Sequence, residues 1–200
     1  MGWVETLKRA TARDPGQPLT AAEREQAVLD VLQMSSLGAA AVTYTPLPLV
    51  DLVAITPIQA AMVMALGRLH GRTLTLAEGR TILVELASVC GAGLVARQLF
   101  TAASKLLLPG IGGMLGGPYA FAVTWALGRT AEGYFEDPAG TRERLKQIFQ
   151  DALAEGRRLF SKEAVEEFRR KRGGEVETFA QQEARPEPPP ADGKKEAPPQ

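Results

Sequence analysis

The feature that most constrains the fold is an uncharged stretch of 23 residues, 106–128, between Lys105 and Arg129. A helix needs about 20 apolar residues to cross the bilayer core, so this stretch is long enough to do so. Pro109, Pro118 and six glycines interrupt it, however, and proline and clustered glycine break or kink helices. The stretch therefore fits either the buried centre of a helical domain or a segment that inserts into a membrane.

Charge is distributed unevenly along the 200 residues. Residues 31–136 contain 11 charged side chains, whereas the remaining 94 positions contain 35. A weakly charged middle of this kind predicts a buried or lipid-facing core with solvated arms. Lys+Arg and Asp+Glu number 23 each, so no net field attracts nucleic acid, and we expect no nucleic-acid partner. Cys90 is the single cysteine, which excludes an internal disulfide and a cysteine-based zinc cluster and favours a reducing compartment.

The first clear helix signal is a capping box formed by Thr20 and Glu23, in which hydroxyl and carboxylate satisfy free backbone amides. We expect the helix that follows to run towards Ala41. Pro46 and Pro48 should end it, because the residue before a proline avoids helical backbone angles.

Thr56 and Pro57 predict a second helix start, with threonine as N-cap and proline at the first helical position. Gly71 is a plausible residue to follow the end of that helix. Only Gln59 and Arg68 interrupt its apolar surface, which is typical of a central core helix or a membrane segment.

A second capping box, Thr75 and Glu78, predicts an amphipathic helix. A further apolar helix and a glycine-rich turn are expected before a helix over residues 118–135. Asp137 and Pro138 then predict another helix start. No stretch of the sequence shows convincing strand-like alternation.

Apolar residues recur at helical spacing after Thr141 and predict a long amphipathic arm. Its apolar stripe must be covered, and three covers are open: the protein's own domain, a second copy or partner, and a membrane surface. The polar face mixes acids with bases, which favours own-domain packing or self-association over a membrane. The basic run 169–172 is interpreted as a solvated helix end, in keeping with the helix dipole. The candidate interaction face comprises Ile148, Phe149, Leu153 and Phe160.

Taken together, these patterns predict an all-α protein with four parts. Residues 1–19 form an N-terminal segment, and residues 20–136 form a compact bundle of apolar helices. Residues 137–173 form the amphipathic helical arm. Residues 174–200, rich in proline, glutamate and lysine, are expected to be a disordered tail, because they contain too few apolar side chains to offset chain entropy.

Six short blocks within residues 35–136 occur in a characteristic order and spacing. They are residues 46–51 (PLPLVD), 55–62 (ITPIQAAM), 67–71 (GRLHG), 108–112 (LPGIG), 124–129 (TWALGR) and 134–136 (YFE). In this arrangement the chain resembles the YcjF-type domain of unknown function. The residues that carry the resemblance are Pro46, Pro48, Asp51, Thr56, Pro57, Gln59, Gly71, Pro109, Gly110, Gly112, Gly128 and Arg129.

The resemblance implies an α-helical module of bacterial proteins that is often membrane-associated. In some members the module follows an Era-like GTPase domain, which this chain lacks. The resemblance supplies no catalytic residues. Two positions depart from the pattern: His70 replaces a larger aromatic or aliphatic residue, and Pro118 adds an unusual break.

Glycines at 110–117 invite comparison with phosphate-binding loops. A Walker loop needs a lysine and a Ser/Thr after its glycines, and both are missing here. We therefore interpret this segment as structural. The pairs Gly112/Gly116 and Gly113/Gly117 fit either a tight loop, which we favour, or close approach of two helices.

Three isolated polar residues are also given structural interpretations. His70, the single histidine, is expected to interact with carbonyl groups at a helix C-terminus. Cys90 is expected to behave as a small buried hydrophobe. Asp51 either caps a turn or forms a buried pair with Arg68 or Arg129.

The leading functional hypothesis is a non-enzymatic, membrane-associated helical module that couples to a protein partner, such as a separately encoded GTPase. The alternative is a soluble helical scaffold or oligomerisation protein. We do not expect an enzyme, because the motifs provide no acid–base pair, metal cluster or activated nucleophile. No cofactor or metal is expected. The candidate partners are a membrane surface or the inner membrane, and a protein partner or a second copy. The expected location is the cytoplasmic side of a bacterial membrane, or else the cytoplasm.

Overall fold

The structure is a computed structural model that describes residues 7, 9, 19–44, 50–90 and 112–184. Within these ranges it is all-α, as predicted. The helices are α2 (Ala21–Val42), α3 (Val50–Leu69), α4 (Leu76–Cys90), α6 (Gly112–Glu136), α7 (Arg142–Leu159) and α8 (Lys162–Ala184).

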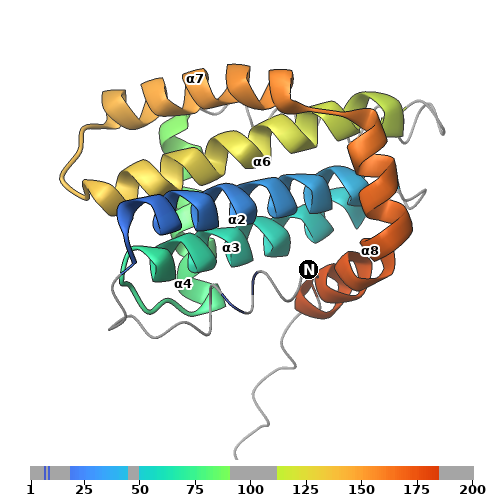
Figure 1. Cartoon of the computed structure of the whole chain (residues 1–200), viewed down its shortest axis with the longest axis horizontal. Coiled ribbons are helices and arrows are strands. Elements are labelled where there is room, and N and C mark those ends of the chain that lie inside the picture. Colours follow the sequence, from blue (N-terminus) through green and yellow to red (C-terminus); the bar gives the residue numbers. More distant parts are fainter. Residues whose placement is uncertain (1–6, 8, 10–18, 45–49, 91–111, 185–200) are drawn as a thin grey trace, which may run out of the picture.

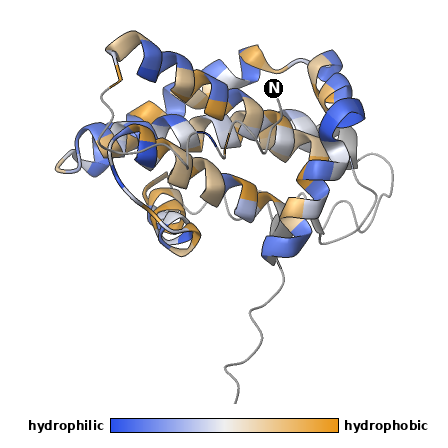
Figure 2. Cartoon of the chain, turned by 60° about the horizontal axis from the view of Figure 1, so that its bottom comes forward, coloured by the Kyte–Doolittle hydropathy of each residue, from blue (hydrophilic) through white to orange (hydrophobic). Residues whose placement is uncertain are grey.

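The helices form a bundle around α2, α3 and α6 (Figure 1). Helix α7 lies along α6, and α4 packs mainly on α3 while also reaching α6 and α7. Helix α8 crosses one end of the bundle and contacts α2 and α3. Hydrophilic residues are concentrated on the helices at the periphery (Figure 2). No helix in the described ranges combines the length and the apolar character needed to span a membrane.

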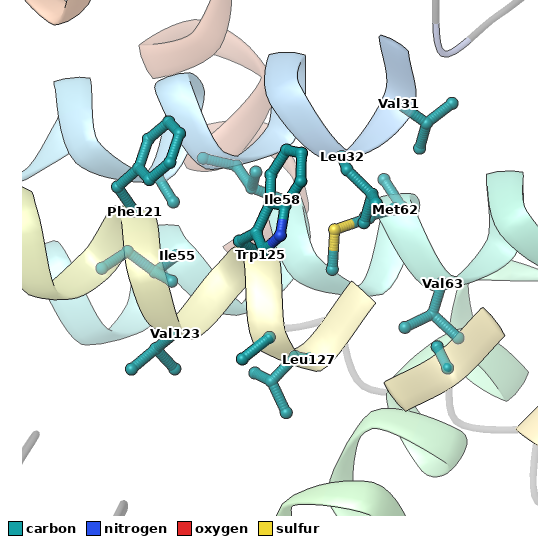
Figure 3. Packing of buried hydrophobic residues seen from close by; sticks show 14 of the residues in the cluster. Val31, Leu32, Ile55, Ile58, Met62, Val63, Phe121, Val123, Trp125 and Leu127 are labelled. Carbon is teal, nitrogen blue, oxygen red and sulfur yellow. The ribbon is translucent and has the colours of Figure 1, made fainter. Parts of the chain in front are cut away.

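The core is centred where α2, α3 and α6 meet (Figure 3). Leu32 of α2, Ile58 and Met62 of α3 are fully buried, and Trp125 of α6 is 4% exposed. A Cβ atom on Gly128 would clash with Leu32 and lie 3.0 Å from the Met62 sulfur. Glycine at this position therefore lets the three helices approach closely, which is a packing role for a residue that carries the family resemblance.

Both predicted capping boxes are confirmed. The Thr20 amide donates to the Glu23 carboxylate at 3.0 Å, and the Glu23 amide donates to the Thr20 hydroxyl at 3.3 Å. Thr75 and Glu78 repeat this arrangement at 2.7 and 3.2 Å. These reciprocal bonds satisfy amides that would otherwise lack partners at the starts of α2 and α4.

Gly71 ends α3 as predicted, with a φ of 76° in the left-handed region. The Arg72 amide donates to the Gly67 carbonyl at 2.8 Å, and the Gly71 amide donates to the Arg68 carbonyl at 3.1 Å. This pair of bonds is a Schellman motif, for which glycine is the favoured residue.

Three predicted helix starts are wrong. Helix α3 begins at Val50, so Thr56 and Pro57 lie inside it. Helix α3 as a whole packs on α2, α4, α6 and α8, and this packing offsets the hydrogen bond that proline cannot make. Helix α6 likewise begins at Gly112 and includes Pro118.

The glycine pairs of residues 112–117 therefore belong to a helix rather than a loop. A Cβ atom on Gly117 would lie 2.8 Å from the Tyr44 ring, so the glycine makes room for this side chain beside α6. The interpretation as a tight loop is therefore wrong, and the group that approaches Gly117 is a side chain beyond the end of α2 rather than a second helix.

The third wrong start is Asp137, because Thr141 is the N-cap of α7. The Thr141 hydroxyl accepts a hydrogen bond from the Arg144 amide at 3.2 Å. Asp137 instead forms a tight turn, in which its carbonyl accepts from the Gly140 amide at 2.9 Å. Thr141 is as good an N-cap residue as Asp137, so the Asp-Pro pattern alone did not identify the start of α7.

The predicted arm is two helices that pack on the bundle rather than one. Phe160 is extended, with ψ of 128°, and the Ser161 hydroxyl accepts from the Ala164 amide at 3.1 Å to start α8. Helix α8 then continues past Gly174 to Ala184, with Val176 and Ala180 fully buried. The predicted end of the helix at residues 173–174 is therefore wrong, because buried side chains beyond the glycines stabilise the helix. Residues 185–200 lie outside the described residues.

Candidate functional site

Several blocks that carry the family resemblance come together at one end of the bundle, where α2 begins and α3 and α6 end. The His70 ring stacks on Phe135, with centroids 6.1 Å apart. The Arg72 guanidinium lies over the rings of Phe135 and Tyr134, at 5.4 and 5.9 Å from their centroids. We call this region the charged end and define it as Glu25, His70, Arg72, Arg129, Glu132, Tyr134 and Phe135.

Arg129 is the central cation of the charged end. Its guanidinium donates to Glu132 at 2.8 Å and to Glu25 of α2 at 3.4 Å. It also lies over the Trp125 ring at 5.7 Å. The Glu132 side chain is only 11% exposed, and burial raises the pKa of its carboxyl, an effect that the hydrogen bond and positive charge of Arg129 oppose.

Trp125 extends this network to α7. Its indole N–H donates to the Glu155 carboxylate at 3.0 Å. Residues of α2, α6 and α7 are thereby tied together through one arginine and one tryptophan. The network contains one cation, Arg129, against the carboxyl groups of Glu25, Glu132 and Glu155, and Glu25 has 53% of its side chain exposed.

His70 and Cys90 are both partly buried. Burial lowers the pKa of His70, and its Nε2 atom has no hydrogen-bond partner among the described residues. Burial raises the pKa of Cys90 to about 11, although a hydrogen bond with Thr130 opposes this shift. Within the described part of the chain, no three His, Cys, Asp or Glu residues are placed to hold a metal ion.

Gln59 links α3 to α6 inside the core. Its side-chain amide donates to the Thr124 hydroxyl at 3.0 Å, and both residues are buried. The sequence marked Gln59 as an interruption of an apolar helix and as one of the residues that carry the family resemblance. Its partner lies 65 residues away in the sequence, so no local pattern could have identified the pair.

The other residues that carry the resemblance are placed as follows. Pro46, Pro48, Pro109 and Gly110 lie outside the described residues. Asp51 belongs to α3, but its side chain is also outside the description. The two interpretations of Asp51 therefore stay open, while the acidic partners described for Arg129 are Glu25 and Glu132.

The four residues of the candidate interaction face lie against the protein's own bundle. Phe149 is 4% exposed, and Ile148 and Leu153 are half-buried against the core. The Phe160 ring meets the edge of Phe121 of α6 at 5.9 Å. Helix α7 approaches α6 so closely that a Cβ atom on Gly156 would lie 2.9 Å from the Ala122 Cα atom.

The basic run 169–172 lies in the middle of α8 rather than at a helix end, so the helix dipole does not account for it. Lys171 pairs with Glu167 at 2.5 Å and Arg172 with Glu175 at 3.9 Å. Arg169 lies over the Tyr44 ring at 5.7 Å, and Arg170 is exposed.

Comparison with known proteins places this helical architecture in a family. Residues 12–158, well over half of the chain, match the family described as "Domain of unknown function (DUF697)". Magnetosome membrane protein 22 of Magnetospirillum gryphiswaldense is 28% identical over 135 residues, which cover 63% of this chain and 68% of that protein. No solved structure matches the chain. This chain belongs to the DUF697 family of domains of unknown function.

Proposed function

We propose that this protein is a non-enzymatic helical module that associates with a membrane and couples to a protein partner. The observation that carries the proposal is the similarity of 135 residues to a protein named as a magnetosome membrane protein. That similarity covers 63% of this chain, so it extends well beyond a single motif.

The geometry of the charged end and of the adjoining Trp125 contact supports a binding rather than a catalytic role. Arg129 is engaged by Glu25 and Glu132, and Trp125 is engaged by Glu155. Groups used in this way fix three helices relative to one another, whereas general acid–base catalysis needs a side chain free to exchange a proton with a substrate. A rigid end with an exposed acidic edge at Glu25 is suited to contact a second protein.

We propose a separately encoded GTPase as this partner, on the cytoplasmic side of a bacterial membrane. The support is the resemblance to domains that are fused to Era-like GTPases, together with the missing lysine in the glycine-rich residues 110–117. The chain alone should then neither bind nor hydrolyse GTP. Isothermal titration with GTP and Mg²⁺ checks this, and micromolar binding would require a nucleotide site on this chain.

Membrane association is tested by flotation of the purified full chain with vesicles of phosphatidylcholine alone and of phosphatidylcholine mixed with phosphatidylglycerol. We expect the chain to float with vesicles, and more strongly with the anionic ones. Fractionation of cells with carbonate and detergent washes then separates peripheral from integral association. A chain that stays at the bottom of both gradients and is wholly soluble in cells would contradict the proposal.

A further inference from the structure

Helix α8 docks on the bundle through two separate sets of apolar side chains. Val165 and Phe168 are buried in its first half, and Val176 and Ala180 are buried in its second half. The residue that continues this helical spacing between Phe168 and Val176 is Arg172, whose side chain is 22% exposed and forms an ion pair. An arginine in this place provides no apolar contact, so the two halves of the helix are anchored independently of each other.

The segment between these two halves is locally unfavourable for a helix. It contains Gly173 and Gly174 side by side, and glycine in a helix interior is unfavourable relative to alanine. The Thr178 hydroxyl donates to the Gly174 carbonyl at 2.7 Å, and side-chain bonds of this kind weaken and bend helices. Helix α8 changes direction along its length (Figure 1). The glycine pair is therefore the place where α8 unwinds most easily.

The far end of α8 is held by a residue of another helix. The last carbonyl groups of a helix have no partner within the helix itself. Arg80 of α4 donates to the Glu183 carbonyl at 2.7 Å, and its guanidinium lies 3.7 Å from the Glu183 carboxylate. The two side chains are 42% and 37% exposed, so solvent reaches this contact. Arg80 thus caps α8 and joins its end to α4 by a bond that can open without disturbing the core.

We propose that residues 175–184 of α8 are a strap that opens while the rest of the bundle stays folded. The glycine pair is its hinge, and the contact of Arg80 with Glu183 is its latch. A released segment as short as this strap does not keep a stable helix in water, so opening unwinds it. Opening exposes the buried side chains of the strap and the surface that they cover. Because the match to the family ends at residue 158, the strap regulates access to this surface without unfolding the family domain.

Amide hydrogen exchange of the full chain, read by mass spectrometry, measures the opening of the strap. In the wild type, residues 175–184 should exchange faster than residues 162–168. Arg80→Ala removes the latch and should speed exchange in the strap by about three- to tenfold. Gly174→Ala adds a methyl group in open space and favours the helical backbone that only the closed strap requires. It should slow exchange in the strap by up to about fivefold.

Two exposed positions provide matched controls. Glu85→Ala on α4 and Gln181→Ala within the strap should leave the exchange of both halves of α8 as in the wild type. Equal changes in residues 162–168 and 175–184 would mean that α8 opens as one unit, which refutes the strap. Unchanged exchange of the strap in Arg80→Ala and in Gly174→Ala would refute both the latch and the hinge. Circular dichroism shows whether Arg80→Ala keeps the folded bundle, and Gly174→Ala decides the question if it does not.

Discussion

The side-chain amide of Gln59 donates a 3.0 Å hydrogen bond to the Thr124 hydroxyl across the buried contact between α3 and α6. Both side chains are almost entirely removed from solvent, with exposures of 5% and 0%. A polar pair in such a place fixes the relative position of two helices, because any sliding leaves both groups without partners.

Thr124→Val should destabilise the protein by about 1–3 kcal/mol, because it leaves the Gln59 amide buried without its partner. Gln59→Leu should cost less, since a helical threonine hydroxyl can turn to a backbone carbonyl. The double variant Gln59→Leu/Thr124→Val should be more stable than the sum of the single effects. Urea unfolding of all four proteins measures this coupling, and strict additivity would show that the bond contributes nothing specific.

Gly156→Ala should destabilise the bundle by about 1–3 kcal/mol, because the new methyl group would meet the backbone of Ala122, which cannot move aside. Gly174→Ala is the matched control, since space around Gly174 is open, and it should stabilise by up to about 1 kcal/mol. Thermal melting of the two variants should therefore show shifts of opposite sign. Equal shifts would mean that α6 and α7 are not in close contact at Gly156.

Arg129→Met should cost more stability near neutral pH than at about pH 5. Burial raises the pKa of Glu132, so the folded protein holds this proton more tightly than the unfolded chain does, and stability falls as pH rises through the folded value. Without Arg129 the pKa of Glu132 rises further. The loss of folding stability on raising the pH therefore grows, to about 1–3 kcal/mol at neutral pH. Urea unfolding at the two pH values checks the sign. The double variant Arg129→Met/Glu132→Gln lacks the Glu132 carboxylate, so its destabilisation should be the same at the two pH values.

Cys90 should react slowly with thiol reagents. Its pKa of about 11, against an ordinary value of 9.0, reduces the thiolate fraction near pH 8 by roughly 100-fold. Labelling with a chromogenic disulfide should therefore be slow in the native protein and become fast in denaturant. A native rate equal to that of a free cysteine would place Cys90 in a more exposed environment.

Truncation after Gly174 should lower the melting temperature by several degrees. It removes the buried Val176 and Ala180 and the contact in which Arg80 donates to the Glu183 carbonyl at 2.7 Å, a loss of about 2 kcal/mol or more. Truncation after Ala184 is the control and should have little effect, because residues 185–200 contain almost no apolar side chains. An unchanged melting temperature in the shorter protein would mean that the end of α8 does not pack on the bundle.

Local signals predicted the helix ends that depend on neighbouring residues. Thr20 with Glu23, Thr75 with Glu78, and Gly71 act within one turn of the backbone, so the sequence is sufficient to locate them. Pro57 and Pro118 misled the prediction, because both sequence patterns favour a helix start and the cost of an interior proline is offset by packing with distant residues.

The candidate site likewise combines residues that the sequence identifies with contacts that only the tertiary structure shows. Arg129 and Gln59 were singled out from the family resemblance, but their partners Glu25 and Thr124 are more than 60 residues away. Trp125 and Glu155 were not paired in advance, since no periodicity links the middle of α6 with the end of α7. These pairs form only when the helices pack against one another.

The sequence by itself determined the helical class, the apolar centre and the local caps, because helix formation and burial depend on the composition and spacing of nearby residues. Tertiary structure decided that the predicted arm is two helices on the bundle, and that α8 extends to Ala184. It also decided that Gly128 and Gly156 are points of close helix approach. These outcomes depend on contacts between residues far apart in the chain, whose free energies outweigh the local preferences of glycine and proline.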